Sequence, residues 1–179
     1  MKRTITPEVI RQLFIYIPES GNLFWRERPT SHFATTRAHS TWNKRFANKE
    51  AGGLSGFGYL YVTVFGQPLL KHRVIWAYVY DQWPLGQIDH INGNRVDNSL
   101  SNLRDVSHAE NGFNVKMPSH NTSGVVGVSF HGKSQKWRSY IKNNQKCHHL
   151  GVFENKDDAI AARKLAEIHY GFHQNHGRK

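Results

Sequence analysis

The residues best suited to chemistry lie between positions 89 and 111. Asp89 is followed directly by His90, and two asparagines stand further along the chain, at Asn102 and Asn111. A carboxylate can anchor a hard cation, an imidazole with a pKa near ~6.5 can take a proton from water, and amides can orient and complete the site. These are the groups that a one-metal site needs to hydrolyse a phosphodiester, so the sequence predicts a nuclease.

The elements expected around these residues form a ββα unit. Residues 87–91 are expected to be a strand, residues 92–102 a Gly/Asn-rich loop and residues 103–106 a second strand. Ser107 and Glu110 make a capping-box pattern, which predicts a helix from there to about position 115.

Each candidate side chain has an expected role in this unit. Asp89 and His90 are successive strand residues, so the loop and the helix can approach each of them separately. Asn111 would occupy the fourth helical position, where asparagine is a poor helix former. Its amide oxygen and the Asp89 carboxylate would offer Mg²⁺ two hard oxygen ligands. Asn102 could accept a hydrogen bond from one imidazole nitrogen and so fix the tautomer of His90.

The other polar residues of this stretch can be explained without a role in catalysis. Asn94 and Asn98 are interpreted as residues that serve turn geometry. Arg95 and Arg104 are candidate phosphate contacts, although either could equally be a solvated surface charge.

Composition indicates a folded protein with a polyanionic partner. The chain has 179 residues, room for one ordinary domain or two small ones, with a net charge of +11 and a pI near 10.0. This charge favours nucleic acid as the partner. No segment has the ~20 apolar residues that a membrane span needs, and the N-terminus lacks the apolar run of a signal peptide. Cys147 is the single cysteine, which excludes an intrachain disulfide and a multi-cysteine zinc site.

The N-terminal part is expected to elaborate the ββα unit. Thr6 with Pro7 predicts a helix start, and the apolar face of this helix is expected to run to Phe14. Residues 28–50 are polar and irregular, and they could be a mobile DNA-contacting loop or a disordered insertion. The other elements expected before position 87 are strands at 23–25 and 58–65, a turn at 66–68 and a helix at 72–80.

The C-terminal part reads as a separate module. Residues 117–123 are rich in turn formers and predict a linker. Three short strand-like runs follow, and then a helix from Asn155 or Asp157 to about Tyr170. Alanines at 159, 162 and 166 give this helix a small-residue face that can lie close to a sheet.

The spacing of the candidate site resembles the signature of the HNH endonuclease family. Asn102 stands twelve residues after His90, and Asn111 stands nine residues further on. This is similar to the histidine-asparagine-asparagine variant found in phage intron-encoded homing endonucleases. The resemblance covers about residues 5–116 and includes the stretches 17–21, 72–76 and 88–103.

The resemblance implies a ββα-metal core at about residues 86–116, within a nuclease domain of residues 1–116. His90 would be the general base, oriented by Asn102. Asp89 and Asn111 would be the metal ligands, and the products would carry 5′-phosphate and 3′-hydroxyl ends. The chain lacks the cysteine pairs by which some relatives bind structural zinc, so we expect a divalent metal, Mg²⁺ or Mn²⁺, and no zinc.

The second module, residues 124–179, resembles the plant ethylene-responsive-factor DNA-binding domain over about residues 124–171. The stretches 127–130, 132–138 and 150–153 and the alanine-bearing helix carry this resemblance. It implies a three-stranded sheet laid in the major groove with the helix behind it, where basic side chains supply salt-dependent phosphate contacts. The candidate DNA contacts are Ser129, His131, Lys133, Lys136, Arg138, Tyr140, Lys142 and Lys146.

The expected fold is α+β: an HNH core with an N-terminal helix and hairpin elaboration, plus a small three-stranded antiparallel sheet packed on one helix. The predicted function is metal-dependent, site-specific cleavage of double-stranded DNA by a homing-type endonuclease. A monomer would nick one strand, and double-strand cleavage would need a dimer or two sequential events. If phage-encoded, the protein would act in the cytoplasm of the bacterial host cell, without a membrane partner.

Two other function classes stay open. A non-catalytic, sequence-specific DNA-binding regulator would carry a degenerate HNH unit, and the intact Asp89, His90 and Asn111 set argues against it. An RNA-binding or RNA-cleaving protein is disfavoured, and competition between duplex DNA and RNA would separate it from the leading hypothesis.

Overall fold

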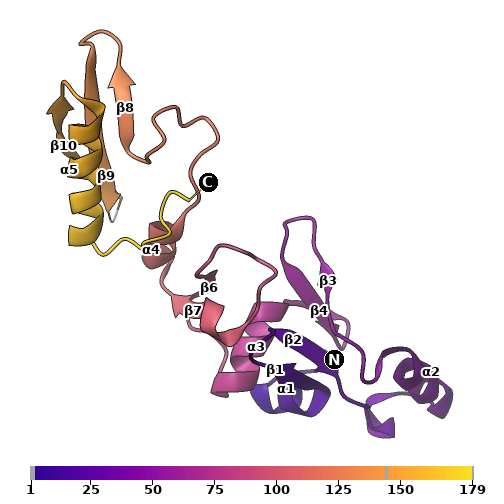
Figure 1. Cartoon of the computed structure of the whole chain (residues 1–179). Coiled ribbons are helices and arrows are strands. Elements are labelled where there is room, and N and C mark those ends of the chain that lie inside the picture. Colours follow the sequence, from indigo (N-terminus) through magenta and orange to yellow (C-terminus); the bar gives the residue numbers. More distant parts are fainter. Residues whose placement is uncertain (1–2, 144, 179) are drawn as a thin grey trace. The chain divides into compact units, whose positions relative to one another are not determined.

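The computed structural model describes residues 3–143 and 145–178. The chain has a mixed α+β fold made of helices and small antiparallel sheets (Figure 1). Its internal contacts divide it into two compact units, which meet between Asp105 and Val106. None of the helices in the described ranges combines the length and the apolar character needed to cross a lipid bilayer.

The first unit begins with a capped helix and a hairpin. Thr6 caps α1 (Pro7–Leu13), because its Oγ1 accepts a hydrogen bond from Val9 N at 3.3 Å, and proline occupies the first turn as predicted. Phe14 was expected on the helix but begins the first strand, fully buried. The hairpin consists of β1 (Phe14–Ile17) and β2 (Asn22–Trp25) in antiparallel register.

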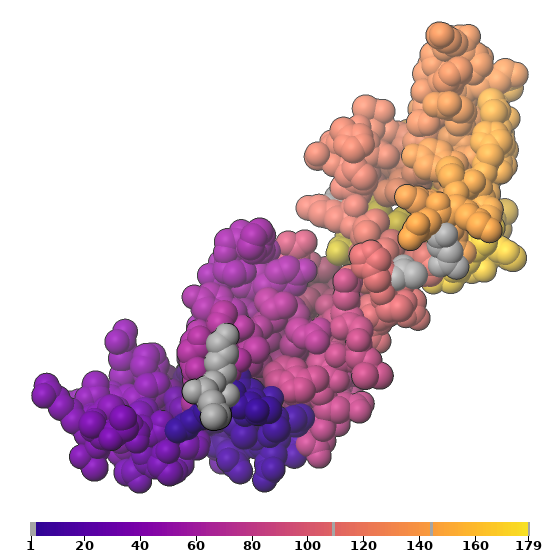
Figure 2. All heavy atoms as spheres, turned by 180° about the vertical axis from the view of Figure 1, so that it is seen from behind, coloured from indigo at the N-terminus to yellow at the C-terminus, as the bar shows by residue number. Residues whose placement is uncertain are grey.

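Residues 28–50 contain a helix where the sequence suggested a loop or a disordered insertion. A short 3-10 turn, η1 (Thr30–His32), precedes α2 (Thr36–Phe46), whose start is capped by Thr35 Oγ1 accepting from Ala38 N at 3.1 Å. Trp42 and Phe46, one turn apart, pack against the core of the unit. Figure 2 shows this purple part of the chain at the outer edge of its unit. Two large apolar side chains in a mostly polar segment make too weak a periodic pattern to predict a helix.

A three-stranded sheet and its helix follow. The turn expected at 66–68 lies one residue earlier, because Val64 pairs with Gln67 and leaves Phe65 and Gly66 as a two-residue hairpin turn. Both have positive φ, 49° and 78°, as such tight turns require. The helix predicted at 72–80 is confirmed. These elements are β3 (Gly53–Leu54), β4 (Leu60–Val64), β5 (Gln67–Leu70) and α3 (Lys71–Tyr80).

The two strands of the candidate site lie where the sequence predicted them, at the C-terminal end of the first unit. They are β6 (Gln87–His90) and β7 (Leu103–Val106), joined by a loop that ends in the 3-10 turn η2 (Leu100–Asn102). Ile88 and Leu103 tie this pair to the hydrophobic core of the unit. The central buried members of that core are Ile10, Leu13, Phe14, Leu23, Val62, Val64, Val74 and Ile75.

The second unit has the predicted β-β-β-α order. Its sheet is antiparallel with strand order β10-β9-β8, and α5 packs against it. Ala159 and Ala166 are buried in that contact, as the small-residue face suggested. The elements are α4 (His108–Asn111), η3 (Gly112–Asn114), β8 (Val128–His131), β9 (Lys136–Asn143), β10 (Lys146–Phe153) and α5 (Lys156–His169).

The compact units divide earlier than the predicted boundary at 116 and linker at 117–123. Residues after β7 pack on the C-terminal tail: the rings of Phe113 and Phe172 stack at 4.4 Å, and Met117 N donates to Arg178 O at 2.9 Å. These contacts join the segment to the second unit. The turn-rich composition of 117–123 signalled irregular backbone, but it held no information about these partners distant in sequence.

Candidate active site

The strand β6 ends at the two residues expected to carry the chemistry. Asp89 and His90 are 7% and 4% exposed. Just beyond the strand, Ile91 N donates to Asn102 O at 2.9 Å, which closes the base of the loop. Both side chains are therefore largely shielded from bulk water.

The loop between β6 and β7 is held by its own side chains. Asn102 spans it: its Oδ1 accepts from Asn92 N and its Nδ2 donates to Asp97 O, both at 2.8 Å. Asn92 Nδ2 also donates to Asp97 Oδ2 at 2.7 Å. Such local bonds satisfy backbone groups that would otherwise be left without partners, and they fix the curvature of the loop.

The side chain that contacts the imidazole is Asn98, a residue that the sequence analysis treated as a turn former. Asn98 is 1% exposed, and its Oδ1 lies 3.1 Å from His90 Nε2. Its Nδ2 donates to Val96 O, so the amide oxygen faces the ring. Nε2 must then carry the hydrogen, which makes Nδ1 the basic nitrogen. The contact with the imidazole that was expected of Asn102 is thus made by Asn98, whereas both Asn102 amide groups bond to loop backbone.

Burial keeps the imidazole of His90 neutral. Loss of hydration lowers its pKa below the ordinary histidine value, with Arg95 acting in the same direction, against the opposing effects of Asn98 and Asp89. The ring of His72 lies edge-on at 5.1 Å and that of Tyr59 at 6.0 Å. Burial also lowers the pKa of His72, to about 3, so this neighbour is uncharged as well. A neutral imidazole is the form that can accept a proton from water.

The carboxylate of Asp89 is paired with an arginine. Arg104 Nε and Nη2 donate to Asp89 Oδ2 at 2.9 and 2.7 Å. Arg104 was a candidate phosphate contact, but its guanidinium is directed to this carboxylate. The pair balances the negative charge that the strand end would otherwise bury.

Arg95 lies at the same end of the unit and stays a candidate phosphate contact. Its guanidinium sits 4.7 Å from the Tyr59 ring centroid, and Nη1 donates to Phe57 O at 2.9 Å. The residue is exposed. Because these contacts already fix the Arg95 guanidinium, it can bind a phosphate near His90 without a further loss of side-chain entropy.

The β1–β2 turn supports the loop from the other side. Tyr16 Oη donates to Asn98 O at 2.9 Å, and Leu100 N donates to Pro18 O at 3.1 Å. A Cβ on Gly21 would lie only 2.3 Å from Asn98 C and from Ser99 N, so this close approach requires glycine. The position of Asn98 thus depends on residues about eighty positions earlier in the chain.

Comparison with known proteins identifies the segment that holds this geometry. Residues 69–113 match the HNH endonuclease family. Protein 3.8 of Escherichia phage T7 is 36% identical over 81 residues, which are 45% of this chain and 67% of the phage protein. The chain belongs to the family of T7 protein 3.8 and carries an HNH endonuclease domain. No solved structure matches it.

The last of the candidate site residues, Asn111, lies on α4. Ser107 Oγ accepts from Glu110 N, and Glu110 Oε2 accepts from Ser107 N, so the predicted capping box is confirmed. Asn111 is the fourth residue of this helix, as expected, but the helix ends there instead of near position 115, and the chain continues as the 3-10 turn η3. The helix belongs to the second compact unit, and the joint role of Asp89 and Asn111 as metal ligands stays a prediction.

The donor chemistry of the HNH segment suits a hard cation rather than a soft one. At the end of β6 it offers a carboxylate beside an imidazole, and Asn111 would add an amide oxygen. Oxygen donors of this kind, with few protein ligands, fit Mg²⁺ or Mn²⁺. Over residues 3–143 and 145–178, no group of three or more His, Cys, Asp or Glu side chains is placed to hold a metal ion.

Most of the candidate DNA contacts of the second unit share one face of its sheet. Along β9, Ser139 and Ile141 are buried while Arg138, Tyr140 and Lys142 are exposed. Because strand residues alternate, these three lie on the side opposite α5. By register, Ser129 pairs with Arg138 and His131 with Lys136 on the same face. Lys133 lies in the β8–β9 turn. Lys146 begins β10 opposite Asn143, so alternation places it on the other face, with Ile141.

Sequence reasoning missed three residues that surround the imidazole of His90. They are Asn98, Tyr59 and His72. His72 stood in a stretch resembling the family, which could have raised it as a candidate. Nothing local marks Asn98 or Tyr59, because their proximity to His90 arises from packing between distant segments.

Proposed function

We propose that this chain is a metal-dependent, site-specific DNA endonuclease of the homing type, with a ββα-metal core of the histidine-asparagine-asparagine variant. The observation that carries the proposal is the buried, neutral imidazole of His90, held at Nε2 by Asn98 next to the Asp89 carboxylate. It lies within the segment that matches the HNH endonuclease family.

In the proposed reaction, His90 takes a proton from the water that attacks the scissile phosphorus in line. Asn98 orients the ring by accepting the Nε2 hydrogen, which leaves Nδ1 as the atom that receives the proton. Arg95, exposed near the imidazole, binds a phosphate of the strand being cut. A divalent ion, Mg²⁺ or Mn²⁺, would be held by Asp89 and Asn111, and when bound it supplies positive charge against the charge developing on the phosphate.

We propose that the second unit targets the enzyme to its site on double-stranded DNA. This is supported by the basic and aromatic side chains on the open face of its sheet, Arg138, Tyr140 and Lys142, together with the net charge of +11. The resemblance to the plant ethylene-responsive-factor domain suggests that this face lies in the major groove. One active centre in a monomer would nick one strand, in the cytoplasm of a bacterial host, as the phage relative suggests.

One observation favours a second candidate, a DNA-binding regulator with a degenerate HNH unit. Arg104 directs both Nε and Nη2 to Asp89 Oδ2, which places positive charge on the proposed metal ligand. If that pair persists in the working protein, a cation would have to displace it.

Nicking of supercoiled plasmid separates the two candidates. The endonuclease should convert it to open circles with Mg²⁺ or Mn²⁺, and His90→Gln should bind DNA without cutting. His120→Gln, which alters an exposed histidine in the segment before β8, is the matched control and should cut as wild type does. If the wild type binds DNA but does not cut it with any metal tested, the protein is a DNA-binding regulator rather than an endonuclease.

A further inference from the structure

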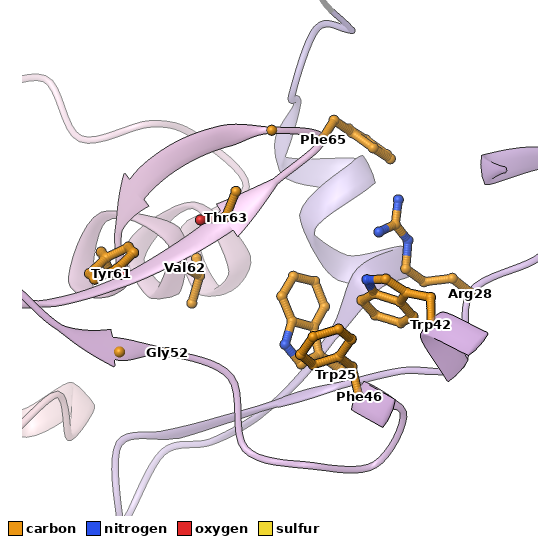
Figure 3. Close-up of a pocket in the computed structure, with 11 residues that line it drawn as sticks. Trp25, Arg28, Trp42, Phe46, Gly52, Tyr61, Val62, Thr63 and Phe65 are labelled. Carbon is orange, nitrogen blue, oxygen red and sulfur yellow. The ribbon is translucent and has the colours of Figure 1, made fainter. Parts of the chain in front are cut away.

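A buried arginine stands in an aromatic cage in the first unit, away from His90. Arg28 is 7% exposed, and its guanidinium carbon lies 5.0, 4.7 and 4.8 Å from the ring centroids of Phe33, Trp42 and Phe65. Its backbone is fixed by Asn43, which bonds to both Arg28 N and Arg28 O. Figure 3 shows the guanidinium between the rings of Phe65 and Trp42.

This guanidinium has no anionic partner within the described ranges. No carboxylate there forms an ion pair with it, and its buried Nε makes no hydrogen bond. The charged group that acts on Arg28 is another cation, Arg3, which also lies over the Phe65 ring, at 4.8 Å. Burial and then Arg3 lower the pKa of Arg28. Rings stabilise a cation but do not fill its planar set of N–H donors, which match a phosphate or a carboxylate.

The arginine borders a cavity large enough for a planar ligand. The cavity has a volume of about 480 Å³ and is walled by Trp25, Trp42 and Phe46 on one side and by β4 on the other, including the exposed Thr63 (Figure 3). Ligand pockets commonly span ~300–1,000 Å³. Aromatic walls bind the faces of nucleobases, and an arginine beside them binds phosphate.

We propose that this cavity is a nucleotide-binding site, in which Arg28 and Arg3 hold a phosphate and the aromatic wall around Trp42 holds an unstacked base. In the working enzyme the nucleotide would belong to the DNA strand outside the scissile position. The choice of DNA as its source rests on the proposed function, whereas the pocket itself does not.

A purely structural role for Arg28, as a clamp between α2 and the β4–β5 turn, makes the opposite prediction for stability. Replacing a buried, unpaired charge with an apolar side chain of similar length should leave the melting temperature unchanged or higher. Loss of a structural clamp would lower it. Arg28→Met therefore distinguishes the two roles.

The test measures binding and stability together. Quenching of tryptophan fluorescence by deoxyadenosine monophosphate, by deoxyadenosine and by inorganic phosphate separates the contributions of phosphate and base. Anisotropy of a labelled single-stranded oligonucleotide tests the nucleotide within a strand. Arg28→Met should weaken binding of the mononucleotide and the oligonucleotide about tenfold or more, as loss of a charged hydrogen bond does. Arg37→Gln, which removes an exposed charge from α2, should change binding less than about twofold.

A second variant decides the question if Arg28→Met does not fold. Thr63→Phe fills the cavity from an exposed strand position, so it should abolish mononucleotide binding at an unchanged melting temperature. Wild-type binding by Thr63→Phe, or equal binding of inorganic phosphate and the mononucleotide, would overturn the proposal. His90→Gln should bind the mononucleotide as wild type does, so loss of cleavage and loss of the pocket are scored separately.

Discussion

Replacing Asn98 with alanine tests the assignment of the residue that orients the imidazole. Asn98→Ala removes the side-chain oxygen that lies 3.1 Å from His90 Nε2. It also removes the hydrogen bond that Asn98 Nδ2 donates to Val96 O. The backbone of residue 98 still accepts from Tyr16 Oη, so the loop keeps its main support. The imidazole loses the acceptor that selects its tautomer.

The size of the effect follows from burial. Asn98 is 1% exposed, so no solvent replaces the lost acceptor directly, and a buried donor left unsatisfied costs about 1–3 kcal/mol. For a unit of this size that corresponds to a fall in Tm of roughly 5–15 °C. General-base catalysis contributes ~10²–10⁴-fold to a rate, and a misoriented base should forfeit about ten- to a hundredfold of it. The Kd for DNA should not change, because Asn98 does not reach the surface.

The assay is the rate of plasmid nicking at saturating enzyme, together with thermal unfolding followed by circular dichroism. Asn94→Ala is the matched control, because the side-chain Oδ1 of this exposed loop asparagine accepts a long hydrogen bond from Val96 N, at 3.3 Å. It should stay within about 0.5 kcal/mol of wild type and nick at the same rate. Asn102→Ala should loosen the loop and lower Tm, since both of its amide groups bond to loop backbone.

The opposite pattern would refute this reasoning. If Asn98→Ala nicks DNA as fast as wild type while Asn102→Ala keeps its Tm and loses cleavage, Asn102 orients the imidazole. The sequence-based assignment would then be the right one.

Three further outcomes are expected. Burial, then His90 and Arg73, lower the pKa of His72 to about 3, so below pH 6.5 the unfolded chain binds a proton that the folded chain does not. The contribution of His72 to the free energy of unfolding is therefore fully present above pH 6.5, and it should fall by about 2 kcal/mol between pH 7 and pH 5. His72→Leu should flatten this slope in thermal unfolding, and an unchanged slope would assign it to other groups. A chelator should abolish nicking and leave DNA binding intact, and metal should restore the cut; nicking that survives the chelator would contradict a metal requirement. Arg138→Gln and Lys142→Gln should each weaken duplex binding and reduce its salt slope by about one, whereas Lys164→Gln, paired with Glu167, should do neither. An unchanged salt slope in both sheet variants would show that this face does not bind the DNA backbone.

Much of the fold could be predicted because its signals are local. The caps at Thr6 and Ser107, the strands β6 and β7 and the β-β-β-α order of the second unit all depend on neighbouring residues. The helix α2 was missed because its large apolar side chains are only Trp42 and Phe46. Their partner Trp25, with ring centroids 5.2 Å from Trp42, is distant in sequence.

The candidate site could be predicted in residue type but not in every role. His90 and Asp89 follow from a strand end that carries a base beside an acid. Whether Asn98 or Asn102 reaches the ring depends on the curvature of the loop, which the β1–β2 turn sets by packing against it. The pairing of Arg104 with Asp89 likewise depends on the register of two strands rather than on spacing.

The packing of the β1–β2 turn against the Asn98 loop limits how the HNH domain can be transferred to another protein. The stretch that defines the family, residues 69–113, begins well after that turn. A graft of this stretch alone would lack the Tyr16 hydroxyl and the Gly21 backbone, which both contact Asn98. Asn98 would then no longer be held in place against the imidazole of His90. A fragment made for transfer should therefore start no later than Thr6. Any substitution of Gly21 should inactivate it by displacing the Asn98 loop, without touching His90 directly.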